Sequence, residues 1–227
     1  MFWQEDDDKP EHAVVPDQIL DLGFSIECKQ LPIDHAWGLK EALLKALPWL
    51  ADEPLARVHR IHVAESSNGW MRPEDTEAQV LVPSRRTKLY LRLPKTRLEL
   101  AQQLTGHTLS LGGYALTVGA AKIRLLQNQP VVFARSVACL PEETEESFLR
   151  RMAAEIQQLT GIKIKKMLCG KSTHLYQPQQ PLLTRQLMMA DLDNETSIKL
   201  QQYGLGEERL MGCGVIIPHK GIKAQDA

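Results

Sequence analysis

A glycine-rich segment near the carboxyl end has the most specific spacing in the chain. The eleven residues of GLGEERLMGCG contain four glycines, Gly204, Gly206, Gly212 and Gly214. Glycine permits positive φ and close approach of another backbone, so such a loop can turn amide N–H groups toward phosphate oxygens. Arg209 at its tip and Lys220 beyond the next strand would add charge. A helix cap plus a tight hairpin is the alternative, but the glycine density beside His219 and Lys220 favours a phosphate-binding loop.

Two histidines lie where a proton could be moved. His35 follows Asp34, a plausible N-cap, at the start of a predicted helix. The helix dipole there favours the neutral ring and Asp34 favours the charged one, so the direction of its pKa shift is left open. His219 lies beside the glycine-rich loop in sequence and could act on a proton, grip phosphate or scaffold the loop. His59 and His62 point to opposite faces of a predicted strand, which favours ordinary sheet positions over a metal site.

The net charge of −1 hides local basic surfaces. Six basic residues and no acid fall between Ser84 and Leu98, and four lysines and no acid lie between Gly161 and Lys171. Lys88, Tyr90 and Arg92 share one face of an alternating strand, which favours RNA over a merely solvated face. Arg185 is either buried and paired or reaches into a cleft. The basic residues predicted to contact RNA are Arg85, Arg86, Lys88, Arg92, Lys165, Lys166, Lys171, Arg185, Arg209 and Lys220.

Composition excludes several protein classes. With 227 residues, 43% hydrophobic and 24% charged, the chain is typical of folded domains rather than of a disordered chain or a coiled coil. Its four scattered cysteines form no C-x-x-C pair, which argues against a zinc ribbon or a disulfide scaffold and fits a reducing compartment. The acidic N-terminus does not resemble a signal peptide, and no apolar run reaches the roughly 20 residues of a membrane helix. We therefore expect a cytoplasmic protein with no membrane contact.

The elements needed to position these residues follow one order twice. Alternation predicts strands over 20–28, 58–64 and 87–93, with a helix between the first two and another over 94–104, then weak strands at 108–111, 115–118 and 122–126. After Gln127–Pro130 we expect a strand at 131–138, a helix at 142–159, strands at 163–168 and 183–190, a helix ending at Tyr203 and a strand at 215–217. The predicted fold class is α+β: two tandem ferredoxin-like (RRM-like, β-α-β-β-α-β) domains with a C-terminal glycine-rich loop. Residues 1–19 would be an acidic flexible leader, 20–128 the N-terminal domain and 129–227 the C-terminal domain with the loop.

Four segments in this order resemble a known family. The chain is similar to the CRISPR-associated repeat-RNA endoribonucleases of the RAMP superfamily, the sixth Cas protein, in their MYXAN-type branch. The resemblance spans roughly residues 20 to 223, and a glycine-rich loop before the last strand of a second ferredoxin-like domain is a hallmark of the superfamily. Trp37 stands where relatives often carry tyrosine, so a hydroxyl role there is not carried over. The segments are LPIDHAWGLKEAL, KKMLCGKS, TRQLMMADL and GLGEERLMGCGVIIPHKGI.

The resemblance implies a metal-independent endoribonuclease without cofactors. It would bind the stem-loop of a repeat in precursor CRISPR RNA and cut by attack of a ribose 2′-OH, leaving a 2′,3′-cyclic phosphate on mature guide RNA. Such attack needs a base for the hydroxyl proton and stabilisation of charge on phosphorus-bound oxygens. In the family a histidine at the start of the first helix commonly acts in catalysis, which favours His35 as general base with His219 as the rival. Other Cas subunits of a Class 1 effector complex are the expected protein partners.

Two further functions fit the same pattern. A catalytically silent RAMP subunit that only binds guide RNA would use the same glycine-rich loop and basic strands. An RRM-like RNA-binding protein with no CRISPR role fits less well. His35 at a cleft between the two halves would favour the nuclease.

Overall fold

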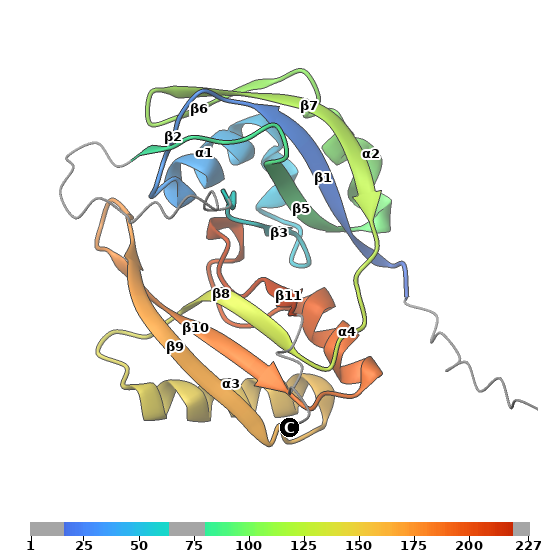
Figure 1. Cartoon of the computed structure of the whole chain (residues 1–227), viewed down its shortest axis with the longest axis vertical. Helices are drawn as coiled ribbons and strands as arrows, with labels where there is room; N and C mark the ends of the chain where they lie inside the picture. The colour runs from blue at the N-terminus through green and yellow to red at the C-terminus, as the bar shows by residue number, and fades with distance from the viewer. Residues whose placement is uncertain (1–15, 64–79, 220–227) are drawn as a thin grey trace, which may run out of the picture.

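The computed structural model describes residues 16–63 and 80–219. Two antiparallel sheets divide these residues into an N-terminal half, β1 to β7, and a C-terminal half, β8 to β11 (Figure 1). Most of the predicted leader, as well as the predicted site residue Lys220, lies outside the described residues. None of the described helices is long and apolar enough to cross a membrane.

The N-terminal half is a five-stranded sheet with helices packed on one face. Its strand order is β3-β5-β1-β7-β6, and β2 and β4 form a separate two-stranded ladder. In chain order its elements are β1 (Ile19–Glu27), β2 (Leu31–Pro32), α1 (Ala36–Ala46), η1 (Pro48–Leu50), β3 (Arg57–Val58), β4 (Val80–Leu81), β5 (Lys88–Pro94), η2 (Lys95–Arg97), α2 (Leu98–Gln102), β6 (Thr108–Leu111) and β7 (Tyr114–Arg124).

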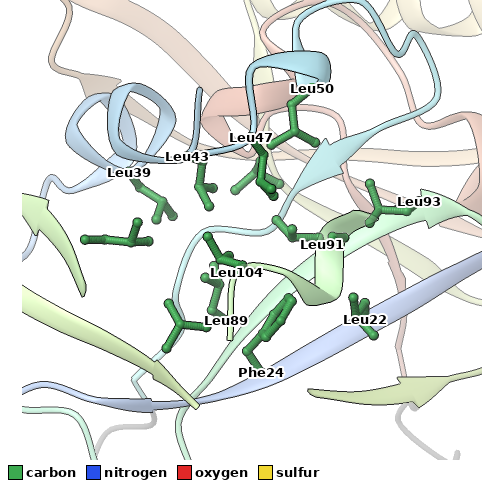
Figure 2. Packing of buried hydrophobic residues seen from close by; sticks show 14 of the residues in the cluster. Leu22, Phe24, Leu39, Leu43, Leu47, Leu50, Leu89, Leu91, Leu93 and Leu104 are labelled. Atoms are coloured by element: carbon green, nitrogen blue, oxygen red, sulfur yellow. The ribbon is translucent and has the colours of Figure 1, made fainter. Parts of the chain in front are cut away.

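Alternation in β1 and β5 builds the core of this half. The even residues of β1, among them Leu22 and Phe24, and the odd residues of β5 face the helices, because successive side chains of a strand point to opposite faces. They meet the leucine stripe of α1 and η1 in one continuous apolar cluster (Figure 2). The labelled members of that cluster are Leu22, Phe24, Leu39, Leu43, Leu47, Leu50, Leu89, Leu91, Leu93 and Leu104.

The C-terminal half repeats the plan with four strands in the order β11-β8-β10-β9. Thr144 caps α3, since its side chain accepts the Ser147 N–H, and Gly161 ends the helix with a left-handed φ of 79°. The helix packs on the sheet through the buried side chains of Phe148, Met152 and Ile156. The elements are β8 (Val132–Ala138), α3 (Glu145–Thr160), β9 (Lys166–Leu175), β10 (Leu182–Ala190), α4 (Asn194–Tyr203), η3 (Arg209–Met211) and β11 (Ile216–Pro218).

The predicted fold class is confirmed. In each half the first and third strands of the β-α-β-β-α-β order lie in the middle of the sheet, and the connecting helices cover one face. The segment of the glycine-rich loop leading to β11 lies between the two sheets (Figure 1).

Several predicted boundaries are wrong. The second strand is only Arg57–Val58, and the helix expected over 94–104 is a 3₁₀ turn followed by the five residues of α2. The two weak strands expected at 115–118 and 122–126 are one strand, β7. The strand expected at 163–168 begins only at Lys166, so Lys165 precedes it, and α3 begins at Glu145 because Thr144 is its cap.

Candidate functional site

The first turn of α1 is held against the C-terminal half. His35, rather than Asp34, is the N-cap residue, and its side chain makes no capping hydrogen bond. The freed Asp34 carboxylate accepts the Tyr176 N–H at 2.6 Å, just beyond β9. Ala36 joins a small apolar cluster with Ala138 of β8 and Met211 of the loop. The predicted catalytic helix start therefore lies where the two halves meet.

His35 is a buried, neutral imidazole with both ring nitrogens engaged. His35 is only 2% exposed. Nε2 accepts the Ile61 N–H at 3.0 Å, so the proton resides on Nδ1, which donates to the Pro32 carbonyl at 2.9 Å. Burial lowers the pKa of His35, and the charge of Arg60 lowers it further, against the raising effect of the Pro32 hydrogen bond. His35 is thus in the protonation state of a base at neutral pH, with its lone pair turned toward Ile61.

The glycine-rich loop packs beside residues 60–61, whose backbone forms a hydrogen bond with His35. Gly212 has a φ of 81°, and a Cβ there would lie 3.0 Å from the Arg60 backbone nitrogen. Gly214 is tighter, since a Cβ there would lie 1.6 Å from the Leu205 carbonyl oxygen. Only glycine allows these approaches together with positive φ. The structure therefore brings the loop and His35 together through residues 60–61.

Most loop amides already have partners within the protein. The Gly206 N–H donates to Glu155 Oε1 at 2.6 Å, and the Gly214 N–H donates to the Ser136 carbonyl at 2.7 Å. Leu205 N–H binds the Gly214 carbonyl, closing the loop on itself. This corrects the expectation that the loop amides of Gly206 and Gly214 are open to phosphate, because internal hydrogen bonds use them to fix the loop shape. Gly204 is likewise buried, and a Cβ there would lie 2.4 Å from the Arg57 guanidinium.

Arg60 lies beside His35, and Arg135 lies near Arg60. Arg60 donates to Ser136 Oγ at 3.2 Å and lies close enough to His35 to affect its titration. Desolvation, and after it the charge of Arg60, lowers the pKa of Arg135, the exposed neighbour of Ser136 on β8. Like charges brought together in this way are stabilised by an anion between or beside them. We call His35, Arg60, Arg135, Ser136 and Gly212 the junction site.

Arg209 ties the loop to the end of η1 and the turn that follows it. Its Nη2 donates to the carbonyls of Leu50, Ala51 and Glu53, at 3.3, 2.8 and 3.0 Å. Arg209 is half-buried and its guanidinium is turned toward the N-terminal half, so its contact with RNA stays a prediction. Beside it, Glu208 pairs with Lys40 of α1 at 3.2 Å. The loop and the helix that carries His35 are therefore connected at several points.

Arg92 joins the two halves and does not face solvent. It is 1% exposed and binds the Asp21 carboxylate through Nε at 2.7 Å and Nη2 at 3.1 Å. Its Nη1 donates to the Gln201 and Ile216 carbonyls of the C-terminal half at 2.7 and 2.6 Å. The alternating pattern correctly predicted that Arg92 lies on the face of β5 opposite the leucines. The C-terminal half covers this face where Arg92 lies. The predicted RNA contact of Arg92 is therefore wrong.

His219 lies away from the junction site. Its backbone N–H bonds to the Val131 carbonyl, before the first residue of β8, and its ring meets Phe133 edge-on at 6.2 Å. His35 lies by the opposite end of that strand, near Ala138. At about 3.3 Å per residue, the two ends are roughly 20 Å apart. The structure does not bring His35 and His219 into one site.

The remaining predicted basic residues fall into two groups. Arg185 is half-buried and donates to the Glu143 carbonyl at 3.1 Å, so it supports the C-terminal half rather than lying free for RNA. Lys166 is exposed and pairs with Asp191 at 2.6 Å, on a surface where such a pair contributes little. Arg85, Arg86, Lys165 and Lys171 are exposed, and Lys88 is half-buried.

Sequence reasoning missed Arg60 and Arg135. Arg135 is the one charged residue in the segment VVFARSVA, and Arg60 lies between two histidines in HRIH directly after β3. Those isolated arginines were the available signal. Nothing in the sequence places the end of β3 against β8, because that contact forms only when the two halves pack.

Metal ligands and thiols give no second site in the described residues. Across 16–63 and 80–219, no three His, Cys, Asp or Glu side chains are arranged to hold a metal ion. Cys28, Cys139, Cys169 and Cys213 are free thiols. Burial raises the pKa of Cys213 to about 12, which leaves it an unreactive core residue.

Comparison with known proteins places the chain in one family. A family model described as Cas6 CRISPR matches residues 20–221. The "CRISPR-associated endonuclease Cas6" of Myxococcus xanthus is 26% identical over 200 residues, covering 88% of this chain and 81% of that protein.

Two solved structures share the fold at low identity. The fold resembles "An RAMP protein binding different RNA substrates" with a TM-score of 0.67 at 14% identity, covering 88% of this chain and 100% of the other. It also resembles "CRISPR associated protein Cas6" with a TM-score of 0.61 at 10% identity, covering 89% and 100%. Because the family model spans nearly the whole chain, including the junction site, the chain belongs to the Cas6 family.

Proposed function

We propose that this protein is a metal-independent endoribonuclease that cuts the repeat stem-loop of precursor CRISPR RNA. Membership of the Cas6 family supports this, as does the name of its Myxococcus xanthus relative, a CRISPR-associated endonuclease. A structural relative described as binding different RNA substrates supports RNA as the ligand class. Mature guide RNA with a 2′,3′-cyclic phosphate is the expected product, and other Cas subunits are the expected partners.

The observation that carries the proposal is a neutral histidine beside Arg60, with Arg135 near that guanidinium group, where the halves meet. Burial, and after it the charge of Arg60, lowers the pKa of Arg135, so a phosphate beside both guanidinium groups is favourable. His35 is held neutral by burial. A scissile phosphate bound by the arginines would bring the adjacent ribose hydroxyl toward His35, which is the arrangement that base catalysis needs.

The proposed reaction forms one bond and breaks one. The 2′ oxygen attacks phosphorus as its proton passes to Nε2 of His35, and the bond from phosphorus to the 5′ oxygen breaks as that oxygen takes a proton from water. Charge on the non-bridging oxygens is stabilised by Arg60 and Arg135. Because the Ile61 N–H occupies Nε2 in the structure, RNA binding must move residue 61 away from the ring. Nδ1, bonded to the Pro32 carbonyl, would keep the ring oriented.

Alanine variants of three histidines test the proposal by single-turnover cleavage of repeat RNA. Loss of a general base costs about 100- to 10,000-fold in rate, which we expect for His35→Ala. His107→Ala, at an exposed turn, is the matched control and should cut like wild type. His219→Ala should also retain the rate, because His219 lies at the other end of β8. Partial rescue of His35→Ala by free imidazole would separate a chemical role from a structural one.

A different outcome would reassign the base or reject it. Equal loss in His219→Ala and His35→Ala without imidazole rescue would contradict His35 as the base. Wild-type rates in both variants would contradict any histidine base at these positions.

One observation favours a second candidate, a non-catalytic subunit that binds guide RNA. His35 is buried and both its nitrogens are occupied, as in a structural histidine. Such a subunit would bind the repeat hairpin tightly and leave it intact at every pH. Any cleavage by pure wild-type protein that His35→Ala lacks would exclude this candidate.

A further inference from the structure

The face of the N-terminal sheet opposite its helices carries an aromatic side chain among cations. Strand register places Tyr90 of β5 next to Gly23 of β1, and Gly23 next to Lys122 of β7. On the same face, Lys88 lies two residues from Tyr90 along β5, and Arg124 lies two residues from Lys122 along β7. Lys122 and Arg124 are exposed, and Lys88 and Tyr90 are half-buried. We call Lys88, Tyr90, Lys122 and Arg124 the β5–β7 patch.

Gly23 explains how the Tyr90 ring lies. A Cβ at position 23 would lie 2.5 Å from Tyr90 Cε1 and 2.9 Å from Cδ1, so one edge of the ring leans directly over β1. A glycine inside a central strand costs stability and often marks such a close approach. Any other residue at position 23 would push the ring away from this position.

Two further groups hold the ring, one of them lying over its face. The Arg124 guanidinium lies 5.9 Å from the ring centroid, and the His59 ring lies 5.8 Å away at 49°. His59 is itself held, because its backbone N–H bonds to the Tyr90 carbonyl and its Nε2 lies 3.2 Å from Asp21. A ring held on several sides loses little entropy when a planar ligand stacks on it.

Within residues 16–63 and 80–219, the cations of this patch have no ion-pair partner. Among the described residues, Lys88, Lys122 and Arg124 form no ion pair, whereas Asp21 on the same face is already bound to Arg92. Unpaired cations beside an aromatic ring suit phosphates beside a base, and RRM sheets bind single-stranded RNA through such aromatic side chains. An acidic protein surface would satisfy the cations but gives no reason for the Tyr90 arrangement.

We propose that the β5–β7 patch binds an unpaired stretch of RNA, with one base stacked on Tyr90 and phosphates on Lys122 and Arg124. The site is distinct from the junction site, where the cut is proposed. This inference rests on the proposed function only in taking RNA as the ligand. Its natural occupant is then a single-stranded part of the precursor outside the repeat stem.

Binding of a fluorescein-labelled ten-nucleotide oligouridine to the full chain tests the proposal by anisotropy. Loss of one stacked base weakens binding roughly 5- to 150-fold, which we expect for Tyr90→Ala. Tyr90→Phe keeps the ring and should bind within about twofold of wild type. Lys122→Ala should reduce the slope of log Kd against log salt by about 0.7, the value for one phosphate contact on a single strand. Tyr203→Ala, at an exposed tyrosine of α4, is the control and should bind like wild type.

A crosslink provides a readout that needs no variant. Ultraviolet irradiation of the wild-type complex should attach uridine to Tyr90, found by mass spectrometry of the β5 peptide. Oligouridine affinity unchanged in both Tyr90→Ala and Lys122→Ala would overturn the proposal, and so would a crosslink confined to other segments. If wild type binds oligouridine at this patch but never cuts repeat RNA, the proposed function fails while this site stands.

Discussion

Arg92→Met should destabilise the protein because it leaves a buried carboxylate without its counter-charge. Burial alone would raise the pKa of Asp21, but the charge of Arg92, and then of His59, holds it well below its usual range. Asp21 is 4% exposed and Arg92 is 1% exposed. Breaking a buried pair by removing one partner costs about 3–5 kcal/mol, a large share of the 5–15 kcal/mol typical of a whole domain.

The two halves should also separate more easily in this variant. Arg92 Nη1 supplies hydrogen bonds to the Gln201 and Ile216 carbonyls, which are lost together with the ion pair. Urea unfolding at pH 7 measures the loss of free energy. Arg150→Ala is the matched control, since its pair with Glu146 is 75% exposed on both sides and should contribute no more than about 0.5 kcal/mol.

The pH dependence of Arg92→Met has a defined sign. In wild type the depressed pKa of Asp21 contributes stability that is present above the unfolded carboxyl pKa near 4 and lost as pH falls below it. Without Arg92 the buried carboxyl takes up a proton on acidification, so the variant's deficit should shrink between pH 7 and pH 5. Asp21→Asn combined with Arg92→Met should recover part of the loss, because no buried charge remains. If Arg92→Met alone has a free energy of unfolding at pH 7 within about 1 kcal/mol of wild type, the reasoning is refuted.

The other predictions concern the base and the loop. Because burial lowers the pKa of His35, the single-turnover rate should rise with pH through a value below the ordinary 6.5 and be flat above it; a rise centred above 6.5 would count against His35. Gly214→Ala should destabilise the protein far more than Gly161→Ala: both glycines have positive φ, but a Cβ at 161 meets nothing within 4 Å, whereas at 214 it meets the Leu205 carbonyl. We expect about 1 kcal/mol for Gly161→Ala, and equal effects of the two in thermal melts would show that the loop backbone can yield. Thr144→Ala should cost about 1 kcal/mol through the lost cap of α3, measured by urea unfolding, and no loss would mean that Ser147 is satisfied otherwise.

The sequence predicted the fold where local rules decide the structure. Period-two leucines in β1 and β5 follow from strand alternation, and the Asp193 cap of α4 and the positive-φ glycines that follow α3 and α4 obey helix-end chemistry. The glycine-rich loop was predicted in the same way. Its closeness to the start of α1 followed from the family resemblance and not from any local pattern.

The misassigned residues share one physical reason. Arginine is usually a surface residue, and only the packing of one half on the other buries Arg92 and turns the Arg209 guanidinium onto backbone carbonyls of the N-terminal half. Arg124 and Lys122 were missed because β7 was divided into two weak strands, which obscured their register beside Gly23. The separation of His219 from His35 likewise depends on which end of β8 each one meets.

The central claim is that a ribose hydroxyl of the repeat attacks its own phosphate. The most direct measurement is mass spectrometry of wild-type cleavage products in EDTA, with normal repeat RNA and with repeat RNA carrying one 2′-deoxy nucleotide at the cut. The account predicts a 2′,3′-cyclic phosphate from normal RNA and an intact deoxy substrate that still binds. Cleavage of the deoxy substrate, or a fragment ending in a 3′-hydroxyl, would contradict it.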